Sequence, residues 1–451
     1  MARTICAIAT APATAALGLI RISGPDAFEI VGPLLKNKNG EAIALPQMRR
    51  SVFCRVADEQ EVYDEVIAVF YKGPHSYTGE DSVELSCHGG LYVLNSILTL
   101  LIRHGCKLAE PGAFSKRAFL NGKLDLVRAQ AVIDLIEAQS RAEQKNALSR
   151  MEGRLSGRIR ALYQQLIDLN STLLAYIDFP EEIEEPEAAV LEKLKVIRSQ
   201  LDQLLEGSKK GRLIEEGLQI AIVGAPNAGK STLLNQLLGY ERSIVSARPG
   251  TTRDMIAEGC RLGDLKCRLA DTAGMRRTQD PIELQGITIA KREAEAAQVV
   301  FVVFDGSQEM QKEDYDLAEA YGGAHNLAVI NKTDLPIKIN EQYIKEKFKH
   351  TVNISAQTGA GCSAIDGWIR SRFSVADAAA QGVLTSAMEI QRITEAKEKL
   401  TQAIAGLEEG FTPDLITIDL TEAASALGEV TGQTVTEQMI EQIFSRFCVG
   451  K

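Results

Sequence analysis

The 451-residue chain contains no long apolar run, because none of its hydrophobic stretches approaches the ~18 residues that a membrane-spanning helix requires. Its eight cysteines form no Cys-x-x-Cys pair and show no spacing typical of zinc ligands. The sequence also has no internal repeat and no low-complexity tract. These absences exclude a membrane-spanning protein, a repeat protein and a cysteine-ligated zinc domain, and we expect reduced thiols, several of them buried.

Basic charge is also scarce, with 50 Lys and Arg against 60 Asp and Glu and a formal net charge of −10. A protein that binds nucleic acid broadly needs a basic surface, so this balance argues against that class without excluding a local RNA contact. The apolar content of 45% and the charged content of 24% are ordinary for a globular protein. The length predicts two to four domains.

The N-terminal part of the chain has the pattern of an α+β domain, in which short strands precede an apolar helix over residues 91–102. The apolar segment from Ile5 to Leu19 superficially resembles a signal peptide. Thr10 and Pro12 interrupt it, so we interpret this segment as a first strand and loop of the folded protein. Further strands are expected at residues 19–22, 52–56, 65–70 and 82–86.

Helical spacing begins at Leu124 and is interrupted by an acidic stretch over residues 178–186, which we interpret as a solvated connection. A further helix is expected from Glu187 to Leu205, followed by a glycine-containing hinge over residues 207–211. Helical pattern returns after an α/β unit, which suggests that this unit is inserted into one helical domain whose two halves pack together. The predicted domains are residues 1–120, 121–214, 215–373 and 374–451.

The stretch from Gly224 to Ser231 fits the phosphate-loop spacing GxxxxGK[ST] between an apolar strand and a helix. Its glycines allow backbone N–H groups to surround phosphate oxygens. Lys230 can reach the β- and γ-phosphates, and Ser231 can ligate Mg²⁺. Asn227 in this loop either places its amide oxygen beside a monovalent cation at the phosphates or only satisfies its own loop.

The sequence Asn331-Lys332-Thr333-Asp334 predicts guanine selectivity, because the Asp334 carboxylate can accept from both N1–H and N2–H₂ of guanine. Adenine lacks this pair of donors and would leave the carboxylate unpaired. Ser355-Ala356 follows a short strand and is placed to support the base. The two motifs in this order predict a GTPase, which requires GTP and is therefore expected in the cytoplasm.

Two further segments complete the expected GTPase. Gly250-Thr251-Thr252-Arg253-Asp254 contains a threonine that can ligate Mg²⁺ and sense the γ-phosphate. In Asp271-Thr272-Ala273-Gly274, Asp271 would hold the Mg²⁺ shell through water. The next residue is Met275, whose thioether cannot orient the attacking water as a glutamine would. The candidates for that role in the following loop are Arg276, Arg277, Asp280 and Glu283, each of which has a solvated surface charge as its alternative interpretation.

Two other features leave alternatives open. Cys448 near the C-terminus is either an inert thiol in a frayed tail or a partly exposed nucleophile. A basic cluster is either a solvated face or an RNA contact. This cluster consists of Arg103, Lys107, Lys116, Arg117, Lys123 and Arg128.

With these residues in view, the chain resembles the MnmE (TrmE) family of tRNA-modification GTPases over essentially its full length. The GTPase motifs and the terminal Cys-Val-Gly-Lys carry part of this resemblance. The remaining matches are Arg21-Ile22-Ser23-Gly24, Ser76-Tyr77-Thr78-Gly79-Glu80-Asp81, Cys87-His88-Gly89-Gly90 and Arg117-Ala118-Phe119-Leu120-Asn121-Gly122-Lys123-Leu124-Asp125-Leu126.

The resemblance implies a multidomain α/β fold: an α+β folate-binding and dimerising N-terminal domain, an all-α helical domain, and an inserted Ras-like P-loop GTPase domain with a mostly parallel, doubly wound sheet. It implies a homodimer that acts on tRNA with the flavoprotein MnmG (GidA) as a heterotetramer. The pair installs an aminomethyl or carboxymethylaminomethyl group at C5 of the wobble uridine. Its one-carbon donor would be 5-formyl- or 5,10-methylene-tetrahydrofolate.

The resemblance also assigns site residues. Glu283 matches the water-orienting glutamate of the family. The other catalytic positions are matched by Lys230, Asp271 and Cys448. Mg²⁺ would be ligated by Ser231 and Thr252. The K⁺ site would comprise Asn227, Ser246, Arg248 and Thr251, and the folate site Arg21, Glu84, Lys123 and Lys451. The GTP site would comprise Asn227, Ala228, Gly229, Lys230, Ser231, Thr232, Ser246, Ala247, Arg248, Pro249, Gly250, Thr251, Thr252, Asp271, Thr272, Ala273, Gly274, Asn331, Lys332, Thr333, Asp334, Ser355, Ala356 and Gln357.

The chain departs from the family pattern in two places. Ala-Pro-Ala-Thr-Ala-Ala over residues 11–16 replaces a glycine-rich loop, which changes the backbone conformations open to it. Ser386-Ala387-Met388-Glu389 replaces an Asn-x-Arg-His pattern, which puts a folate or RNA contact there in doubt.

Two rival functions are considered. One is a ribosome-assembly or RNA-binding regulatory GTPase, which is disfavoured because the flanks of the GTPase domain are not basic. The other is a folate-dependent methyltransferase regulated by GTP.

Overall fold

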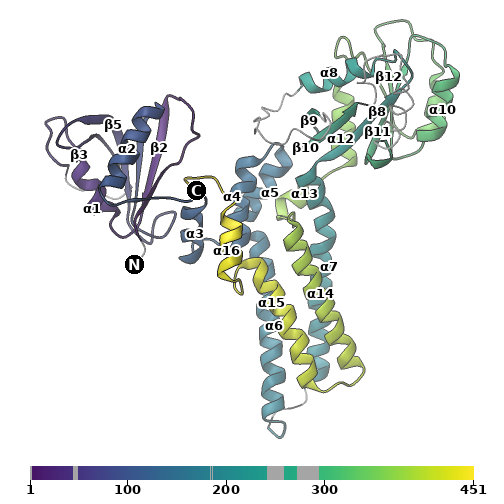
Figure 1. The fold of residues 1–451 in the computed structure, drawn as a ribbon. Helices are drawn as coiled ribbons and strands as arrows, with labels where there is room; N and C mark the ends of the chain where they lie inside the picture. The colour runs from purple at the N-terminus through teal and green to yellow at the C-terminus, as the bar shows by residue number, and fades with distance from the viewer. Residues whose placement is uncertain (1–2, 44–48, 183, 185, 241–257, 272–293) are drawn as a thin grey trace, which may run out of the picture. The chain divides into compact units, whose positions relative to one another are not determined.

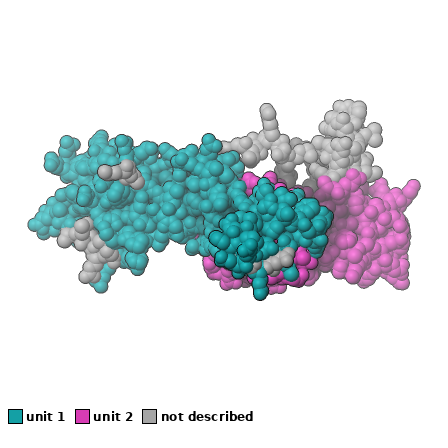
Figure 2. Space-filling model, turned by 90° about the horizontal axis from the view of Figure 1, so that it is seen from below, with its two compact units in different colours: residues 1–133, 156–188, 402–451 teal, residues 134–155, 189–401 magenta. Residues whose placement is uncertain are grey.

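The computed structural model describes residues 3–43, 49–182, 184, 186–240, 258–271 and 294–451. Its chain forms two compact units, coloured separately in Figure 2. The first unit comprises residues 1–133, 156–188 and 402–451, and the second comprises residues 134–155 and 189–401. Within the described residues, no helix combines the length and the apolar character needed to cross a bilayer.

A seven-stranded mixed sheet forms the N-terminal part of the first unit (Figure 1). Its strands are β1 Ile5–Ile8, β2 Leu17–Ser23, β3 Leu35–Lys36, β4 Ser51–Ala57, β5 Val62–Tyr71, β6 Ser82–His88 and β7 Lys107–Leu108. The spatial order is β3-β4-β5-β6-β2-β1-β7, and only β1 and β7 pair in parallel. Helices α1 (Ala27–Val31) and α2 (Leu91–Arg103) bury apolar side chains on one face of this sheet. The predicted α+β architecture is confirmed.

The first unit also contains helices from both ends of the chain. These elements, wholly or mostly in the first unit, are the 3₁₀ helix η1 Gly32–Leu34 and the helices α3 Ala113–Leu120, α4 Leu126–Glu137, α6 Arg154–Asp178, α15 Pro413–Thr431 and α16 Glu437–Phe444. The amide of Asn170 on α6 donates to Thr421 Oγ1 on α15 at 3.2 Å. The helical segments before and after the α/β insertion therefore pack together, as predicted.

A six-stranded sheet forms the centre of the α/β part of the second unit. Its strands are β8 Leu218–Gly224, β9 Glu258–Leu262, β10 Leu265–Asp271, β11 Val299–Asp305, β12 Leu327–Asn331 and β13 Thr351–Asn353. The order is β13-β12-β11-β8-β10-β9, and all neighbours are parallel except β9 and β10.

Helices cover both faces of this sheet. Helices α8 (Lys230–Tyr240) and α12 (Ser363–Arg372) pack against one face. Helices α10 (Lys312–Tyr321) and α11 (Glu341–Lys347) pack against the other. Because the carboxyl ends of parallel strands share one edge, the loops after β8, β12 and β13 lie at that edge, where open α/β sheets bind their ligands.

The remaining helices lie wholly or mostly in the second unit and are α5 Arg141–Met151, α7 Glu187–Glu216, α13 Ala376–Gln381 and α14 Ala387–Glu408. Helix α7 continues through residues 207–211, so the predicted hinge is wrong. A Cβ at Gly211 would lie 1.9 Å from the Leu384 carbonyl oxygen, and Ser208 is buried. The glycine is therefore explained by close packing of the helix against residue 384 and not by flexibility.

Helix α5 contacts both the α/β part of the second unit and helix α13, which follows the α/β part in the sequence. The Ala142 N–H donates to the Asp264 carbonyl at 3.0 Å, and Glu143 pairs with Lys266 at 2.6 Å, so α5 holds the β9–β10 hairpin. Ser149 Oγ donates to the Ala380 carbonyl at 2.8 Å, which fixes α13 to the same helix.

Arg150 on α5 is fully buried, and the two terminal nitrogens of its guanidinium contact two carboxylates and a hydroxyl. Its guanidinium contacts Asp134 and Thr385 Oγ1, each at 2.7 Å, and it also pairs with Glu389. Glu389 belongs to the segment that departs from the family pattern. Its carboxylate forms this internal ion pair at the start of α14, which explains an acidic residue at that position.

Candidate functional site

The phosphate loop adopts a backbone that exposes its N–H groups. It leaves the edge of the sheet at Gly224, and α8 begins at Lys230. Asn227 and Gly229 have φ angles of 61° and 96°, and a Cβ at Gly229 would lie 2.2 Å from the amide nitrogen of Asn331. Only glycine fits there, because a side chain would displace Asn331. The loop and the helix N-terminus together form a site for an anion.

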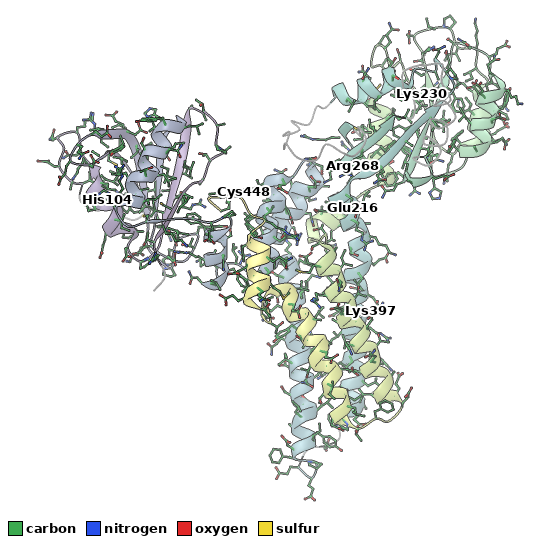
Figure 3. All side chains as sticks on the ribbon, viewed as in Figure 1. His104, Glu216, Lys230, Arg268, Lys397 and Cys448 are labelled. Atoms are coloured by element: carbon green, nitrogen blue, oxygen red, sulfur yellow. The ribbon has the colours of Figure 1, made fainter. Side chains whose placement is uncertain are left out.

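Lys230 supplies the positive charge of this loop (Figure 3). Its ammonium donates to the carbonyl oxygens of Gly224 and Ala225 at 2.8 and 2.9 Å. These two bonds hold the ammonium over the loop, where it can turn to a phosphate oxygen. The backbone cradle and this cation fit the β- and γ-phosphates of a nucleotide.

Asn331 connects the phosphate loop to the predicted base-binding loops. Its side chain is buried, donates from Nδ2 to the Ala228 carbonyl and accepts at Oδ1 from the Ala356 N–H, both at 2.9 Å. Three segments far apart in the sequence therefore meet at one amide. Asn331 is a positioning residue, because both ends of its amide are used within the protein.

Lys332 and Asp334 differ in their contacts. The Lys332 ammonium pairs with Asp305 at 2.6 Å, and bonds from Lys332 and Ser307 lower the pKa of the Asp305 carboxyl against the opposing effect of its burial. Asp334 is exposed, and its carboxylate has no bonded partner among the described residues. An exposed carboxylate beside the phosphate loop fits the predicted role of accepting from guanine.

The loop after β13 is held by a hydrogen bond from the loop after β12 and by a side chain of its own. The Thr333 N–H donates to the Ile354 carbonyl at 3.1 Å, and the Thr358 N–H donates to Ser355 Oγ at 3.3 Å. Gln357 is exposed. The structure thus brings together the three predicted nucleotide-binding segments that it describes, namely residues 224–232, 331–334 and 355–357.

The metal and switch residues are described only in part. Ser231 and Thr232 lie exposed in the first turn of α8, and the backbone of Asp271 pairs with β8 at the end of β10. Within the described residues, no three His, Cys, Asp or Glu side chains gather to hold a metal ion. The other predicted residues lie outside the described part: Ser246, Ala247, Arg248, Pro249, Gly250, Thr251, Thr252, Thr272, Ala273, Gly274, Met275, Arg276, Arg277, Asp280 and Glu283.

A second site lies in the first unit, where three predicted folate residues meet. Arg21 on β2 and Glu84 on β6 are directly opposite each other and form an ion pair at 2.8 Å. The Arg21 guanidinium also donates to the Gly450 carbonyl at 3.1 Å. It lies 5.2 Å from the centre of the Tyr77 ring and 5.7 Å from that of Phe114. The Arg21 guanidinium thus contacts a carboxylate, a carbonyl oxygen and two aromatic rings.

The C-terminal tail is fixed against this site. The Phe114 N–H donates to the Lys451 carbonyl at 3.1 Å. Gly450 has a φ of 90°, and a Cβ there would lie 2.5 Å from Ala9 Cα. Burial and the positive charge of Arg21 lower the pKa of the Lys451 ammonium. Two cationic side chains in one region favour an anionic ligand there.

Cys448 and Lys123 reach this region in different ways. The Cys448 thiol is exposed (Figure 3), and the Cys448 carbonyl accepts from the Lys451 N–H at 3.3 Å and from the Gly112 N–H at 3.4 Å. The tail is therefore packed, which contradicts the interpretation of Cys448 as part of a frayed end.

Lys123, the fourth predicted folate residue, donates to the Pro74 carbonyl at 3.0 Å. Sequence reasoning missed Phe114 as part of the site, and gave Tyr77 only as a member of a matching motif.

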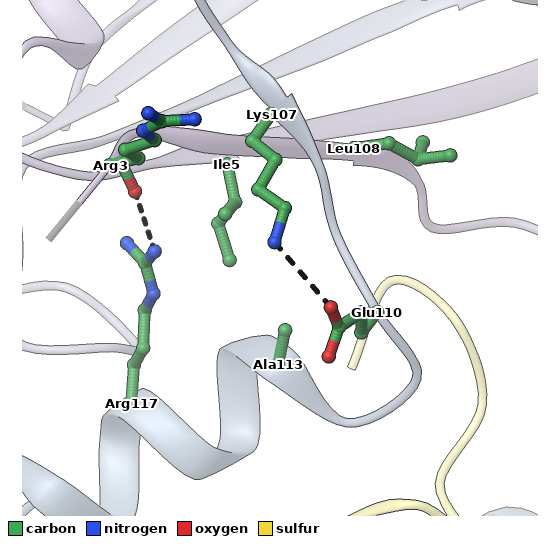
Figure 4. Close-up of a pocket in the computed structure, with 7 residues that line it drawn as sticks. All are labelled: Arg3, Ile5, Lys107, Leu108, Glu110, Ala113 and Arg117. Carbon is green, nitrogen blue, oxygen red and sulfur yellow. Dashed lines mark hydrogen bonds and ion pairs between the residues drawn. The ribbon is translucent and has the colours of Figure 1, made fainter.

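A pocket of about 420 Å³ opens beside α3 in the first unit (Figure 4). Arg117 spans part of it and donates to the Arg3 carbonyl at 2.6 Å and to Glu80 at 2.7 Å. Lys107 pairs with Glu110 at 3.5 Å. Two members of the basic cluster are thus engaged within the protein, which weakens the case for an RNA contact there.

The comparisons with known proteins agree with this arrangement. The family model described as "GTP-binding protein TrmE N-terminus" matches residues 4–123. The model described as "MnmE helical domain" matches residues 126–448, which is more than half of the chain. Among solved structures, the G domain of the FeoB iron transporter of Thermotoga maritima covers 35% of this chain and 98% of its own, at 20% identity and a TM-score of 0.27, a likeness too weak to bear on function.

Curated relatives match along nearly the whole chain. A protein named tRNA modification GTPase MnmE from Thermoanaerobacter pseudethanolicus is 40% identical, over 99% of each chain. The proteins of the same name from Thermotoga maritima and Bacillus subtilis are 40% and 36% identical, each over 99% of this chain and 100% of the relative. This chain therefore belongs to the MnmE (TrmE) family of tRNA modification GTPases.

Proposed function

We propose that this chain hydrolyses GTP to drive modification of the wobble uridine of tRNA at C5, with a flavoprotein partner and a folate one-carbon donor. The modification is an aminomethyl or carboxymethylaminomethyl group, and the flavoprotein is the chain's MnmG (GidA) counterpart in a heterotetramer. The observation that carries the proposal is that one chain contains two different candidate sites. One is a phosphate loop joined by Asn331 to a guanine-binding loop. The other is an Arg21–Glu84–Lys451 site closed by the C-terminal tail.

Hydrolysis requires groups that the described nucleotide loops do not supply. The phosphate loop offers backbone N–H groups and Lys230, and a Mg²⁺ ion on Ser231 and Thr252 would neutralise the developing charge on the phosphate oxygens. We propose that Glu283 orients the attacking water, because Met275 cannot. We further propose that a K⁺ ion binds at Asn227, Ser246, Arg248 and Thr251. The exposed position of Asn227 and its φ of 61° leave its amide oxygen able to serve that site.

We propose that the chain acts as a homodimer that forms through its N-terminal sheet. Phe53 on β4 and Ile67 on β5 are directly opposite each other, and both are exposed. Leu17 on β2 is exposed as well. Large uncovered apolar side chains on one sheet are typical of a protein interface. Dimerisation would also bring two GTPase domains together and let each complete the other's K⁺ site.

The folate proposal depends on the chemistry of the Arg21 site. A reduced folate has a pterin whose pyrimidine ring is planar, and a glutamate tail, so it needs both polar groups and aromatic surface. The polar groups are supplied by Arg21, Glu84 and Lys451. The aromatic surface is supplied by Tyr77 and Phe114. Cys448 lies beside Lys451 and is proposed as a catalytic thiol for transfer of the one-carbon unit.

Deletion of the gene, followed by analysis of tRNA nucleosides, tests the function. We expect the C5-modified wobble uridine to disappear and to return when the unaltered chain is supplied in trans. Because these reactions consume GTP and take place on tRNA, we also expect the protein in the cytoplasm. Unchanged wobble uridine together with altered ribosome profiles would instead support the ribosome-assembly alternative.

A further inference from the structure

The pocket beside α3 (Figure 4) borders the Arg21 site. Ala113, in the first turn of α3, lines the pocket, and the next residue, Phe114, contributes a ring beside the Arg21 guanidinium. Ile5 also lines the pocket, and it packs with Phe114 in one small apolar cluster. The pocket and the Arg21 site therefore share the first turn of α3 and this cluster.

The strand register places both on one face of the N-terminal sheet. Ala7 on β1 is directly opposite Arg21 on β2. Ile5, two residues before Ala7, is directly opposite Lys107 on β7. Because opposite residues share a face, as do residues two apart on a strand, Lys107 and Arg21 lie on the same face. Two strand spacings of about 4.8 Å and two residue rises of about 3.3 Å put their Cα atoms about 12 Å apart.

The pocket is positively charged, although the chain as a whole is acidic. Its lining contains three cationic side chains and one carboxylate, a formal excess of two positive charges, whereas the whole chain carries −10. The cations are Arg3, Lys107 and Arg117, and the carboxylate is Glu110. An excess of this sign around a cavity favours a ligand with more than one negative charge.

Two of these cations are available to a ligand. The Lys107 ammonium is 3.5 Å from Glu110, and the two side chains are 58% and 79% exposed, so exchanging this partner for a ligand carboxylate costs little. The Arg3 guanidinium has no bonded partner among the described residues, because only the Arg3 carbonyl is used by Arg117. Arg117 differs, since its own guanidinium is held by that carbonyl and by Glu80.

An RNA backbone would need more cations than the pocket offers. Proteins that bind nucleic acid through its backbone neutralise several phosphates, and only Arg3 and Lys107 are available here. The pocket is lined by β1, β7 and α3 of one unit, and it matches a small ligand that carries about two carboxylates.

We propose that this pocket is a subsite for the γ-linked glutamate chain of a polyglutamylated reduced folate, whose folate body lies at the Arg21 site. The inference rests on the folate proposal above and deepens it, because it names the form of the donor that binds best. Each added glutamate brings one carboxylate on a flexible arm, and this arm extends along the sheet from Arg21 to Lys107 and Arg3. Charge-assisted hydrogen bonds from the last two side chains supply the added affinity.

Equilibrium dialysis of the full-length protein with tetrahydrofolate and with its tri-γ-glutamate form tests the proposal. We expect the triglutamate to bind about tenfold more tightly at about 50 mM salt and the preference to shrink at about 500 mM, because salt screens exposed charges. The double variant Arg3→Gln/Lys107→Gln should bind both forms equally, and its affinity for the monoglutamate should stay that of the unaltered chain. The Arg3 carbonyl that holds Arg117 remains in this variant.

A matched variant exists at the opposite edge of the same sheet. Lys36 lies on β3 and Arg55 on β4, at the far end of the strand order from β7. Lys36→Gln/Arg55→Gln removes the same two charges and should keep the preference for the triglutamate. Loss of the preference in this variant would assign it to the net charge of the chain and overturn the subsite.

The remaining outcomes separate the two proposals. Equal affinity of the unaltered chain for both folates overturns the subsite while the folate site stands. Failure of the unaltered chain to bind either folate overturns both. A preference for the triglutamate that persists in Arg3→Gln/Lys107→Gln overturns the assigned residues. If that variant also loses tRNA binding, the pocket is assigned to RNA instead.

Discussion

The nucleotide site and the Arg21 site are built in opposite ways. The nucleotide site collects short continuous segments, each of which leaves the carboxyl end of a parallel strand, so one edge of the sheet brings them together. The Arg21 site joins a residue of the second strand to the last two residues of the chain. The first arrangement follows from the order of strands, whereas the second depends on where the C-terminal tail packs.

The two sites also present their polar groups by different means. Around the phosphate loop the backbone provides most of the donors, and the side chain of Asn331 is used for positioning. At the Arg21 site the side chains provide the charge, and they are already paired with one another. Substitution should therefore reveal two independent sites, each of which fails without affecting the other.

The largest effect is expected for Lys230→Ala. Loss of the ammonium removes the cation that stabilises the phosphate charge, and we expect kcat for GTP hydrolysis to fall about 10²–10³-fold. A phosphate-release assay checks this result. Folate binding by the same protein should be unaltered, because Lys230 lies in the other unit. A parallel loss of folate binding would show that the two sites are coupled through folding.

The next effect is expected for Arg21→Ala, which leaves Glu84 without its partner and frees the tail at Gly450. We expect affinity for tetrahydrofolate to fall about 30-fold or more, because truncation of one member of a partly buried charge pair leaves the other without its partner. Equilibrium dialysis provides the measurement.

A matched control for Arg21 exists on the same sheet. Arg55 and Glu65 are also directly opposite each other and ion-paired, but they are more exposed and lie away from the tail. Arg55→Ala should leave folate affinity unaltered and GTP hydrolysis intact. Equal losses for Arg21→Ala and Arg55→Ala would show that the Arg21 pair acts only through the stability of the sheet.

A smaller effect is expected for Asn331→Ala. The substitution leaves the Ala228 carbonyl and the Ala356 N–H without partners, which should cost about 1–3 kcal/mol of local stability. Hydrogen exchange at Ala356 measures this cost directly. Asn340→Ala, which removes an exposed helix cap that accepts from the Tyr343 N–H at 3.1 Å, should not change exchange at Ala356. No change for Asn331→Ala would mean that the loops hold their positions without the amide.

Sequence patterns could indicate the phosphate loop and the loops after β12 and β13, because each motif is contiguous and needs a particular backbone. Residues 207–211 show where such reasoning fails: Gly211 suggested a hinge, but its glycine is explained by the approach of the Leu384 carbonyl. Arg150 shows the same limit, since a charged residue in a helix predicts an exposed side chain. Its burial depends on Glu389, more than two hundred residues away, and spacing does not reveal such a partner.

The smallest effect concerns His88, another pair that only the fold brings together. Its Nδ1 lies 2.6 Å from the Asp64 carboxylate, which also accepts from the His88 N–H at 2.8 Å. The hydrogen bond and charge of Asp64 raise the pKa of His88 above its ordinary value of 6.5. The pair therefore stabilises the fold fully below the unfolded pKa and loses this contribution as the pH rises through the raised value.

An NMR titration of the His88 ring checks this prediction. Asp64→Asn should lower the pKa of His88 toward 6.5, because the amide keeps the shape of the carboxylate without its charge. Glu65→Gln should lower it less, because Glu65 contributes the weakest of the effects that raise it. Should Asp64→Asn leave the titration unaltered, the pair would not form in solution, and the N-terminal sheet would lack at least one of the non-local contacts that distinguish it from the motif-built nucleotide site.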